Sequence, residues 1–133
     1  MWLWHVPVLF ELALASDGWH IAQHLSFVVT ALLFWTAMLD PRRLRAGTGV
    51  AIGCLFVTAI VGGTLGALMA LSDSPWYASY IALGMTPFGL SPQQDQQLAG
   101  LLMWIPGGLY HLAAALWFLT RGLNEGNHAT QSP

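Results

Sequence analysis

The stretch GVAIGCLFVTAIVGGTLGALMAL, residues 49–71, carries no charged side chain and is long enough to cross a lipid bilayer as a single helix. Two further stretches share this property, Trp19–Leu39 and Leu98–Thr120. A transmembrane helix needs about 20 predominantly apolar residues, and each of the three stretches meets that length. We therefore expect an all-α integral membrane protein with three transmembrane helices, near residues 19–39, 49–71 and 98–120.

The composition of the whole chain agrees with this fold class. Of its 133 residues, 56% are hydrophobic and 8% are charged, and the mean hydropathy is +0.58. A soluble domain usually carries about 25% charged residues. The net charge of -2, with four basic residues, gives no sign of nucleic-acid binding, and the single Cys54 excludes an internal disulfide. We expect one helical membrane domain, residues 1–123, and a polar, disordered tail, residues 124–133.

Residues 1–15 are apolar but short for a span. Pro7 and Glu11 interrupt the segment, and Trp2 and Trp4 are suited to the membrane interface. An N-terminal interfacial helix is the favoured interpretation, with a tilted fourth span as the alternative. No basic region precedes the apolar residues, which argues against a cleavable signal peptide.

The connection between the first two predicted spans is basic. Arg42, Arg43 and Arg45 lie there, and the positive-inside rule places such a connection in the cytoplasm. The N-terminus and the loop of residues 72–97 then lie outside, and the C-terminus lies inside, where Arg121 supports the same orientation.

Several residues are typical of helix ends. Asp17 is a candidate N-cap for the first span, and Asp40, followed by proline, should end it. Ser91 and Pro92 fit the N-cap and the first position of the third helix, which should therefore begin outside the membrane. Pro106 should kink this helix partway along.

Small residues recur four apart in the second span, at Gly49-x-x-x-Gly53 and Gly62-x-x-x-Gly66. This spacing lets helix backbones approach closely. It indicates that the second helix is packed against other helices.

Two histidines begin the first span. His20 and His24 are four residues apart, so both rings lie on one face of a helix, a spacing by which one helix supplies two metal ligands. Ionisable groups entering a membrane are costly, which favours a functional role for the pair. If Trp104 marks the outer interface, His111 lies at a similar depth and the three imidazoles converge. If the third span enters at Leu98, His111 is about 20 Å deep and does not meet the pair.

Two other side chains are candidates beside these imidazoles. Met103 offers a thioether suited to soft Cu(I), and Asp95 offers a carboxylate that would orient a ligating histidine. The candidate metal residues are thus His20, His24, His111, Met103 and Asp95. The chain shows no nucleophile–base arrangement, no phosphate-binding glycine loop and no paired carboxylates, so we do not expect an enzyme.

Four blocks of sequence occur together in the order Trp4-His5-Val6-Pro7, His20-Ile-Ala-Gln23-His24 followed by Phe34-Trp35, Pro75-Trp76-Tyr77 with Tyr80, and Asp95-Gln96-Gln97-Leu-Ala-Gly100-Leu-Leu-Met103-Trp104-Ile-Pro106-Gly107-Gly108. In these blocks the chain resembles the C-terminal half of the CtaG-type membrane proteins, assembly factors of bacterial haem-copper cytochrome c oxidase. The resemblance implies a multi-pass protein of the bacterial inner membrane that helps build the copper-containing centre of the oxidase. Its expected partners are subunits of a haem-copper oxidase.

The chain departs from this family in two ways. Gln23 stands where a glutamate is frequent, and family members are typically longer, with further spans and another histidine motif before this region. Ligands from such a region would have to come from a partner or a second copy of the chain.

Three hypotheses remain at this stage. The first is a non-enzymatic assembly factor that handles copper through outward-facing histidines. The second is a structural accessory subunit of a respiratory membrane complex without a metal of its own. The third is haem ligation across helices by His24 and His111, which requires equal depth of the two rings.

Overall fold

The computed structural model of the chain describes the backbone of residues 1–40, 48–85 and 88–130, with side chains up to residue 124 in these ranges. Every regular element in this part of the chain is a helix: η1 (Trp2–His5), α1 (Pro7–Ala15), α2 (Asp17–Leu39), α4 (Thr48–Leu71), α5 (Ala78–Leu83) and α6 (Pro92–Thr130). Three of them, α2, α4 and α6, are long and apolar enough to cross a membrane. The predicted fold class is confirmed.

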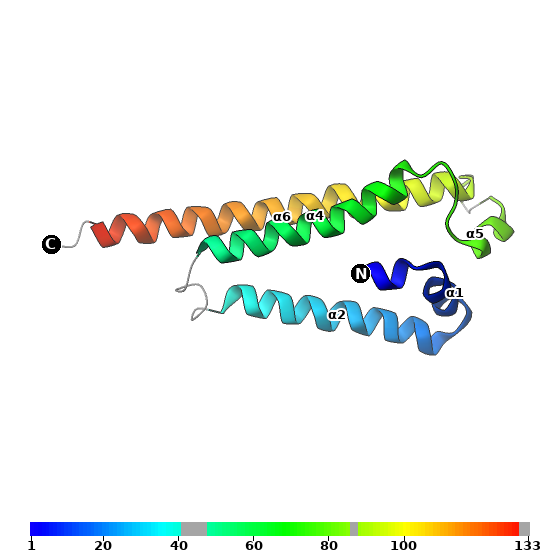
Figure 1. Ribbon diagram of the computed structural model, residues 1–133, viewed down its shortest axis with the longest axis horizontal. Helices are drawn as coiled ribbons and strands as arrows, with labels where there is room; N and C mark the ends of the chain where they lie inside the picture. The colour runs from blue at the N-terminus through cyan, green and yellow to red at the C-terminus, as the bar shows by residue number, and fades with distance from the viewer. Residues whose placement is uncertain (41–47, 86–87, 131–133) are drawn as a thin grey trace.

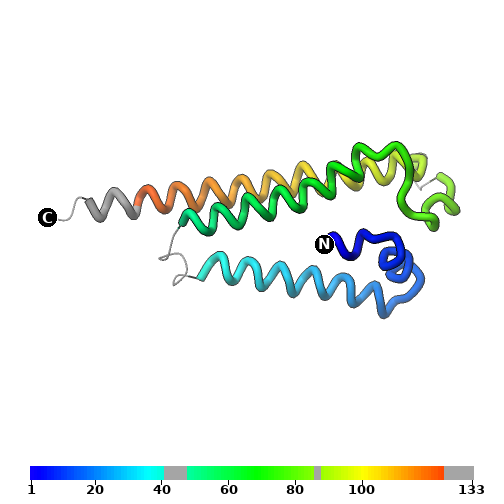
Figure 2. Tube along the Cα trace, in the orientation of Figure 1, coloured from blue at the N-terminus to red at the C-terminus, as the bar shows by residue number. Residues whose placement is uncertain are grey.

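The three long helices run side by side (Figure 1). Helices α4 and α6 are packed against each other along the length of α4, and α2 lies beside them. The short elements η1, α1 and α5 gather at one end of the bundle with the loop of residues 72–77. We call this the capped end, and α6 runs from it past the first residues of α4 at the opposite end (Figure 2).

Helices α4 and α6 approach most closely where two glycines face each other. A Cβ atom added to Gly100 would lie 2.6 Å from both the backbone nitrogen of Ala70 and the carbonyl oxygen of Gly66. A Cβ atom added to Gly66 would lie 2.9 Å from the carbonyl oxygen of Gly100. The two backbones are therefore in direct contact, which only glycine permits at these positions.

The small-residue spacing correctly predicted a packed helix but identified few of the contacting residues. A Cβ atom added to Gly49, Gly53 or Gly62 would meet no atom of the described residues within 4 Å. Of the four glycines in the two predicted patterns, Gly66 alone makes the close contact, and its partner Gly100 belongs to neither pattern.

A second contact joins all three long helices farther from the capped end. Ala51 and Leu55 of α4 and Phe118 of α6 form a buried core, and Phe34 and Met38 of α2 pack against it. Apolar side chains on the outer faces, such as Leu32, Leu33 and Phe56, are exposed, as expected for helices whose surroundings are lipid tails.

The ends of α6 differ in how well the sequence predicted them. Ser91 and Gln94 form a reciprocal capping box: each backbone N–H donates to the other's side-chain oxygen, at 3.0 Å and 3.3 Å. The predicted N-cap is thus confirmed. The helix continues through Pro106 and reaches Thr130, across the segment that we expected to be a disordered tail. This segment has no proline before residue 133, so its backbone hydrogen bonding can continue.

The predicted C-terminal end of α2 is confirmed, and its predicted N-cap is wrong. The helix ends at Leu39, with Asp40 in an extended conformation, as predicted. Ser16, not Asp17, occupies the N-cap position, and its side chain makes no capping bond. Asp17 instead lies in the first turn, where its charge suits the helix dipole. Arg42, Arg43 and Arg45 lie outside the described residues, so the orientation of the chain in the membrane stays a prediction.

The N-terminal segment is two helices rather than one interfacial helix. Val6 is extended between η1 and α1, and Pro7 takes the first position of α1. The indole N–H of Trp2 donates to the carbonyl oxygen of Val61 at 2.9 Å, and that of Trp4 donates to Ser26 Oγ at 2.8 Å. Val61 lies about 15 Å along α4 from its end at Leu71, so η1 folds back between α2 and α4.

A hydrogen-bonded contact fastens α1 to α5. The backbone N–H of Ser79 donates to Oε1 of Glu11 at 3.0 Å, and the hydroxyl of Ser79 donates to Oε2. The side-chain hydrogen bond from Ser79 is the largest cause that lowers the pKa of Glu11 below its usual value of 4.5. The contact therefore needs the ionised carboxylate.

We expect this α1–α5 contact to weaken in acid. A lowered pKa means that the stabilisation is present above the unfolded value of 4.5 and is lost as the pH falls through the folded value. Hydrogen exchange at the Ser79 amide, corrected for its intrinsic rate, should lose protection as the pH falls from 4.5 through the lowered folded pKa of Glu11. In Glu11→Gln the protection should be lower and nearly independent of pH. A wild-type protection that stays constant while the Glu11 carboxylate is protonated would contradict this.

Candidate functional site

His20 and His24 lie together on the first turns of α2. Their ring centroids are 4.6 Å apart, with an angle of 38° between the ring planes. Both side chains are exposed, and His24 also meets the edge of Phe27 at 6.5 Å. The i, i+4 spacing alone produces this pairing, so the predicted pair is present once α2 is helical.

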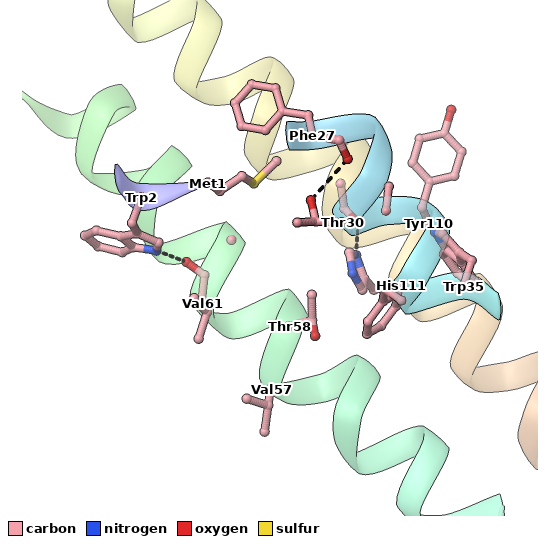
Figure 3. Close-up of a pocket in the computed structure, with 14 residues that line it drawn as sticks. Met1, Trp2, Phe27, Thr30, Trp35, Val57, Thr58, Val61, Tyr110 and His111 are labelled. Atoms are coloured by element: carbon pink, nitrogen blue, oxygen red, sulfur yellow. Dashed lines mark hydrogen bonds between the residues drawn. The ribbon is translucent and has the colours of Figure 1, made fainter. Parts of the chain in front are cut away.

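His111 lies elsewhere, in the interior of the bundle. It is half-buried and lines a cavity of about 730 Å³ between α2, α4 and α6, together with Thr30 and Thr58 (Figure 3). Its Nδ1 is 2.7 Å from the carbonyl oxygen of Gly107. A carbonyl only accepts, so a neutral ring carries its proton on Nδ1 and keeps a free lone pair on Nε2.

The contact between α4 and α6 decides the depth of His111. Gly100 faces Gly66 and Ala70, close to the end of α4 at Leu71. Leu98 is therefore level with the end of α4, which matches the second of the two depths considered from the sequence. His111 lies near the middle of the span and does not join His20 and His24.

Asp95 lines a different and smaller cavity, of about 160 Å³, at the capped end. His5, Met69 and Tyr77 line the same cavity. Burial, followed by the nearby Tyr80, raises the pKa of Tyr77 to about 12, so its hydroxyl is neutral there. His5 is not among the residues predicted to bind a metal, although it belongs to the block Trp4-His5-Val6-Pro7 that carries part of the family resemblance.

The five predicted metal residues thus do not form one cluster. His20 and His24 are paired, Asp95 and His111 line separate cavities, and Met103 is half-buried on α6. Within residues 1–40, 48–85 and 88–124, no three His, Cys, Asp or Glu side chains are grouped so that they could hold a metal ion.

The Asp95-Gln96-Gln97 block has a clear structural role. Gln96 is 6% exposed, and its Oε1 accepts from the backbone N–H of Trp76 at 2.7 Å. Its Nε2 donates to the carbonyl oxygen of Ser74 at 3.3 Å, and Gln97 Nε2 donates to that of Ser72 at 3.1 Å. These amides hold the loop of residues 72–77 against α6.

Tyr77 extends this anchoring to the N-terminal helices. Its hydroxyl donates to the carbonyl oxygen of His5 at 3.2 Å, and its ring stacks on Phe10 with centroids 3.8 Å apart. Trp4 of η1 in turn meets Trp19 of α2 edge to face at 6.4 Å. A chain of contacts thus runs from α6 to the start of α2, where the histidine pair lies.

These features define a multi-pass helical membrane protein with a histidine pair at one end of its bundle and a histidine in its interior. The family of cytochrome c oxidase caa3 assembly factors matches residues 1–125, and the chain belongs to this family. The resemblance inferred from the sequence blocks is confirmed. No curated protein and no solved structure matches the chain significantly.

Proposed function

We propose that this chain helps to build a caa3-type cytochrome c oxidase by handling copper for its metal centre, and that His20 and His24 are the primary ligands. Membership of the assembly-factor family over residues 1–125 supports the role in assembly. The observation that supports copper handling is the side-by-side placement of two exposed imidazoles, 4.6 Å apart. Imidazole is a good ligand for copper, and copper binds nitrogen ligands more tightly than the other divalent first-row metals.

The exposed pair suits a metal that is passed on. Two ligands from one helix leave positions on the ion open, and an acceptor protein or a second copy of the chain would fill them. Asp95, Met103 and His111 remain secondary candidates. Because the structure separates them from the pair, they would contact copper at other stages or after a rearrangement.

The orientation that fits this role places the pair on the outer side of the bacterial inner membrane. The arginines at positions 42, 43 and 45 would then lie in the cytoplasm. The expected partners are subunits of a haem-copper oxidase within the same bilayer.

The proposal is tested by measuring whether the protein needs His20 and His24 to retain copper. In detergent-purified protein, we expect wild type to hold copper near one ion per chain, and His20→Ala/His24→Ala to bind Cu(I) at least about tenfold more weakly in competition with a chelator. The matched control is Gln23→Ala, which changes a neighbouring polar residue of the same helix and should bind like wild type. Full copper content in the double variant would refute a role for the pair.

A structural accessory subunit is the second candidate. The direct backbone contact between α4 and α6 and the exposed apolar outer faces would suit a permanent place among other helices. Copper bound by neither wild type nor variant, even after Cu(I) is added, would favour this role. Stoichiometric co-purification with the mature, active oxidase would favour it as well, whereas association with the immature oxidase alone would favour assembly.

A further inference from the structure

The cavity that contains His111 is a second candidate site, distinct from the histidine pair. Its volume of about 730 Å³ falls within the range of about 300–1,000 Å³ that is typical of small-molecule sites. Thr30, Thr58 and His111 enter it from three different helices (Figure 3). Each of these residues lies near the middle of its helix, so the polar part of the cavity is deep in the span.

The polar hydrogens of Thr30, Thr58 and His111 are each already committed to a hydrogen bond within their own helix. The hydroxyl of Thr30 donates to the carbonyl oxygen of Ser26 at 2.7 Å, and that of Thr58 donates to the carbonyl oxygen of Cys54 at 2.8 Å. His111 Nδ1 is committed to Gly107. What remains on these three residues is the Nε2 lone pair and those of two hydroxyl oxygens, so this part of the cavity accepts hydrogen bonds.

The other residues that line the cavity further restrict the classes of ligand that it could bind. Phe27, Phe34 and Trp35 supply aromatic walls, on which a flat ring can stack. Among the residues that the structure describes, no lysine or arginine side chain lines the cavity, so the carboxylates of a ligand such as haem would lack a basic side chain to pair with. The imidazole of His111 and the thioether of Met1 are both ligands that suit Cu(I), but the space is far larger than an ion.

We propose that this cavity binds a lipid-soluble hydroquinone, with one phenolic hydroxyl donating to Nε2 of His111. The aromatic walls hold the ring, the Thr58 hydroxyl accepts from the second phenolic hydroxyl with the Thr30 hydroxyl as the alternative acceptor, and the apolar tail leaves through the open side of the cavity into lipid. The oxidised quinone binds more weakly, because its two carbonyl oxygens only accept and would face acceptors. This binding does not depend on copper handling.

The test uses the full chain in lipid nanodiscs and two probes, decylubiquinol kept reduced under anaerobic conditions and decylubiquinone. By titration calorimetry we expect saturable binding of one quinol per chain, with the quinone bound about tenfold more weakly. His111→Leu should weaken quinol binding about tenfold and change quinone binding little. Leu112→Val, at a neighbouring residue that is 56% exposed and does not line the cavity, should match wild type.

Two further variants guard against a folding failure of His111→Leu and separate quinol binding from copper handling. Thr58→Val preserves shape and removes one acceptor, so it should weaken quinol binding severalfold even if His111→Leu does not fold. His20→Ala/His24→Ala should bind quinol like wild type, which separates this test from that of copper handling. Lack of saturable binding, or equal affinity for both probes that His111→Leu and Thr58→Val leave unchanged, would overturn the proposal. So would a Soret band in the purified protein that His111→Leu removes, because the occupant would then be haem.

Discussion

A Gly100→Ala protein should be less stable than wild type by about 1–3 kcal/mol. The added Cβ would lie 2.6 Å from two backbone atoms of α4, the nitrogen of Ala70 and the oxygen of Gly66. Backbone atoms cannot rotate aside as a side chain can, so the helices must move apart. Separation would also loosen the contact of Trp104 with Gly63 and Gly66. Thermal unfolding followed by tryptophan fluorescence in detergent would measure the loss.

The matched control lies on the same helix. A Cβ added to Gly108 meets nothing within 4 Å, so Gly108→Ala changes the same residue type in open space. Alanine favours helix over glycine by about 1 kcal/mol, so this variant should be as stable as wild type or slightly more stable. Equal unfolding temperatures for Gly100→Ala and Gly108→Ala would show that α4 and α6 do not meet at Gly100.

These glycines also show how far the sequence could predict the packing. The three spans follow from hydropathy, because crossing a bilayer is a property of each segment alone. The pairs of glycines that come into contact depend on the register of α6 against α4. The sequence does not fix this register, because Gly49, Gly53, Gly62 and Gly66 fit a small-residue pattern equally well. The structure selects Gly66, and it pairs this residue with Gly100 across two helices.

The candidate sites also differ in how far the sequence could predict them. The contact of His20 with His24 is local to one helix, so the spacing sufficed to predict it. The depth of His111 depends on where α6 enters the membrane, and hydropathy left two answers open. The placement of His5 beside the cavity of Asp95 requires η1 to fold back, which no local pattern indicates.

The second large effect is expected for Gln96→Leu. Leucine is close to glutamine in size, but it leaves the part-buried N–H of Trp76 without its partner, and the carbonyl oxygen of Ser74 keeps only its bond from the Ser72 hydroxyl. A hydrogen bond within a protein contributes about 0.5–1.5 kcal/mol, so losing two of them should loosen the loop of residues 72–77 from α6 by about 1–3 kcal/mol. Hydrogen exchange across residues 72–77 should accelerate, and with it exchange in η1, because Tyr77 bonds to the carbonyl oxygen of His5.

The control for this variant is Gln93→Leu, one turn earlier on α6. Gln93 is half-buried, and within the described part of the chain its side chain makes no hydrogen bond, so exchange in the loop should stay at the wild-type rate. Slow exchange in both variants would mean that Gln96 does not hold the loop.

The Gln96→Leu protein also shows how far the histidine pair depends on the capped end. His20 and His24 are held together by α2 itself, so we expect the variant to lose the order of η1 and the loop yet bind Cu(I) within about twofold of wild type. Copper binding that falls together with loop protection would mean that the ion also contacts the capped end. His5 and Asp95 would then be the residues to replace next, because they line the cavity that Gln96 also lines. Copper binding that stays intact while the loop detaches would restrict the primary site to the two imidazoles of α2.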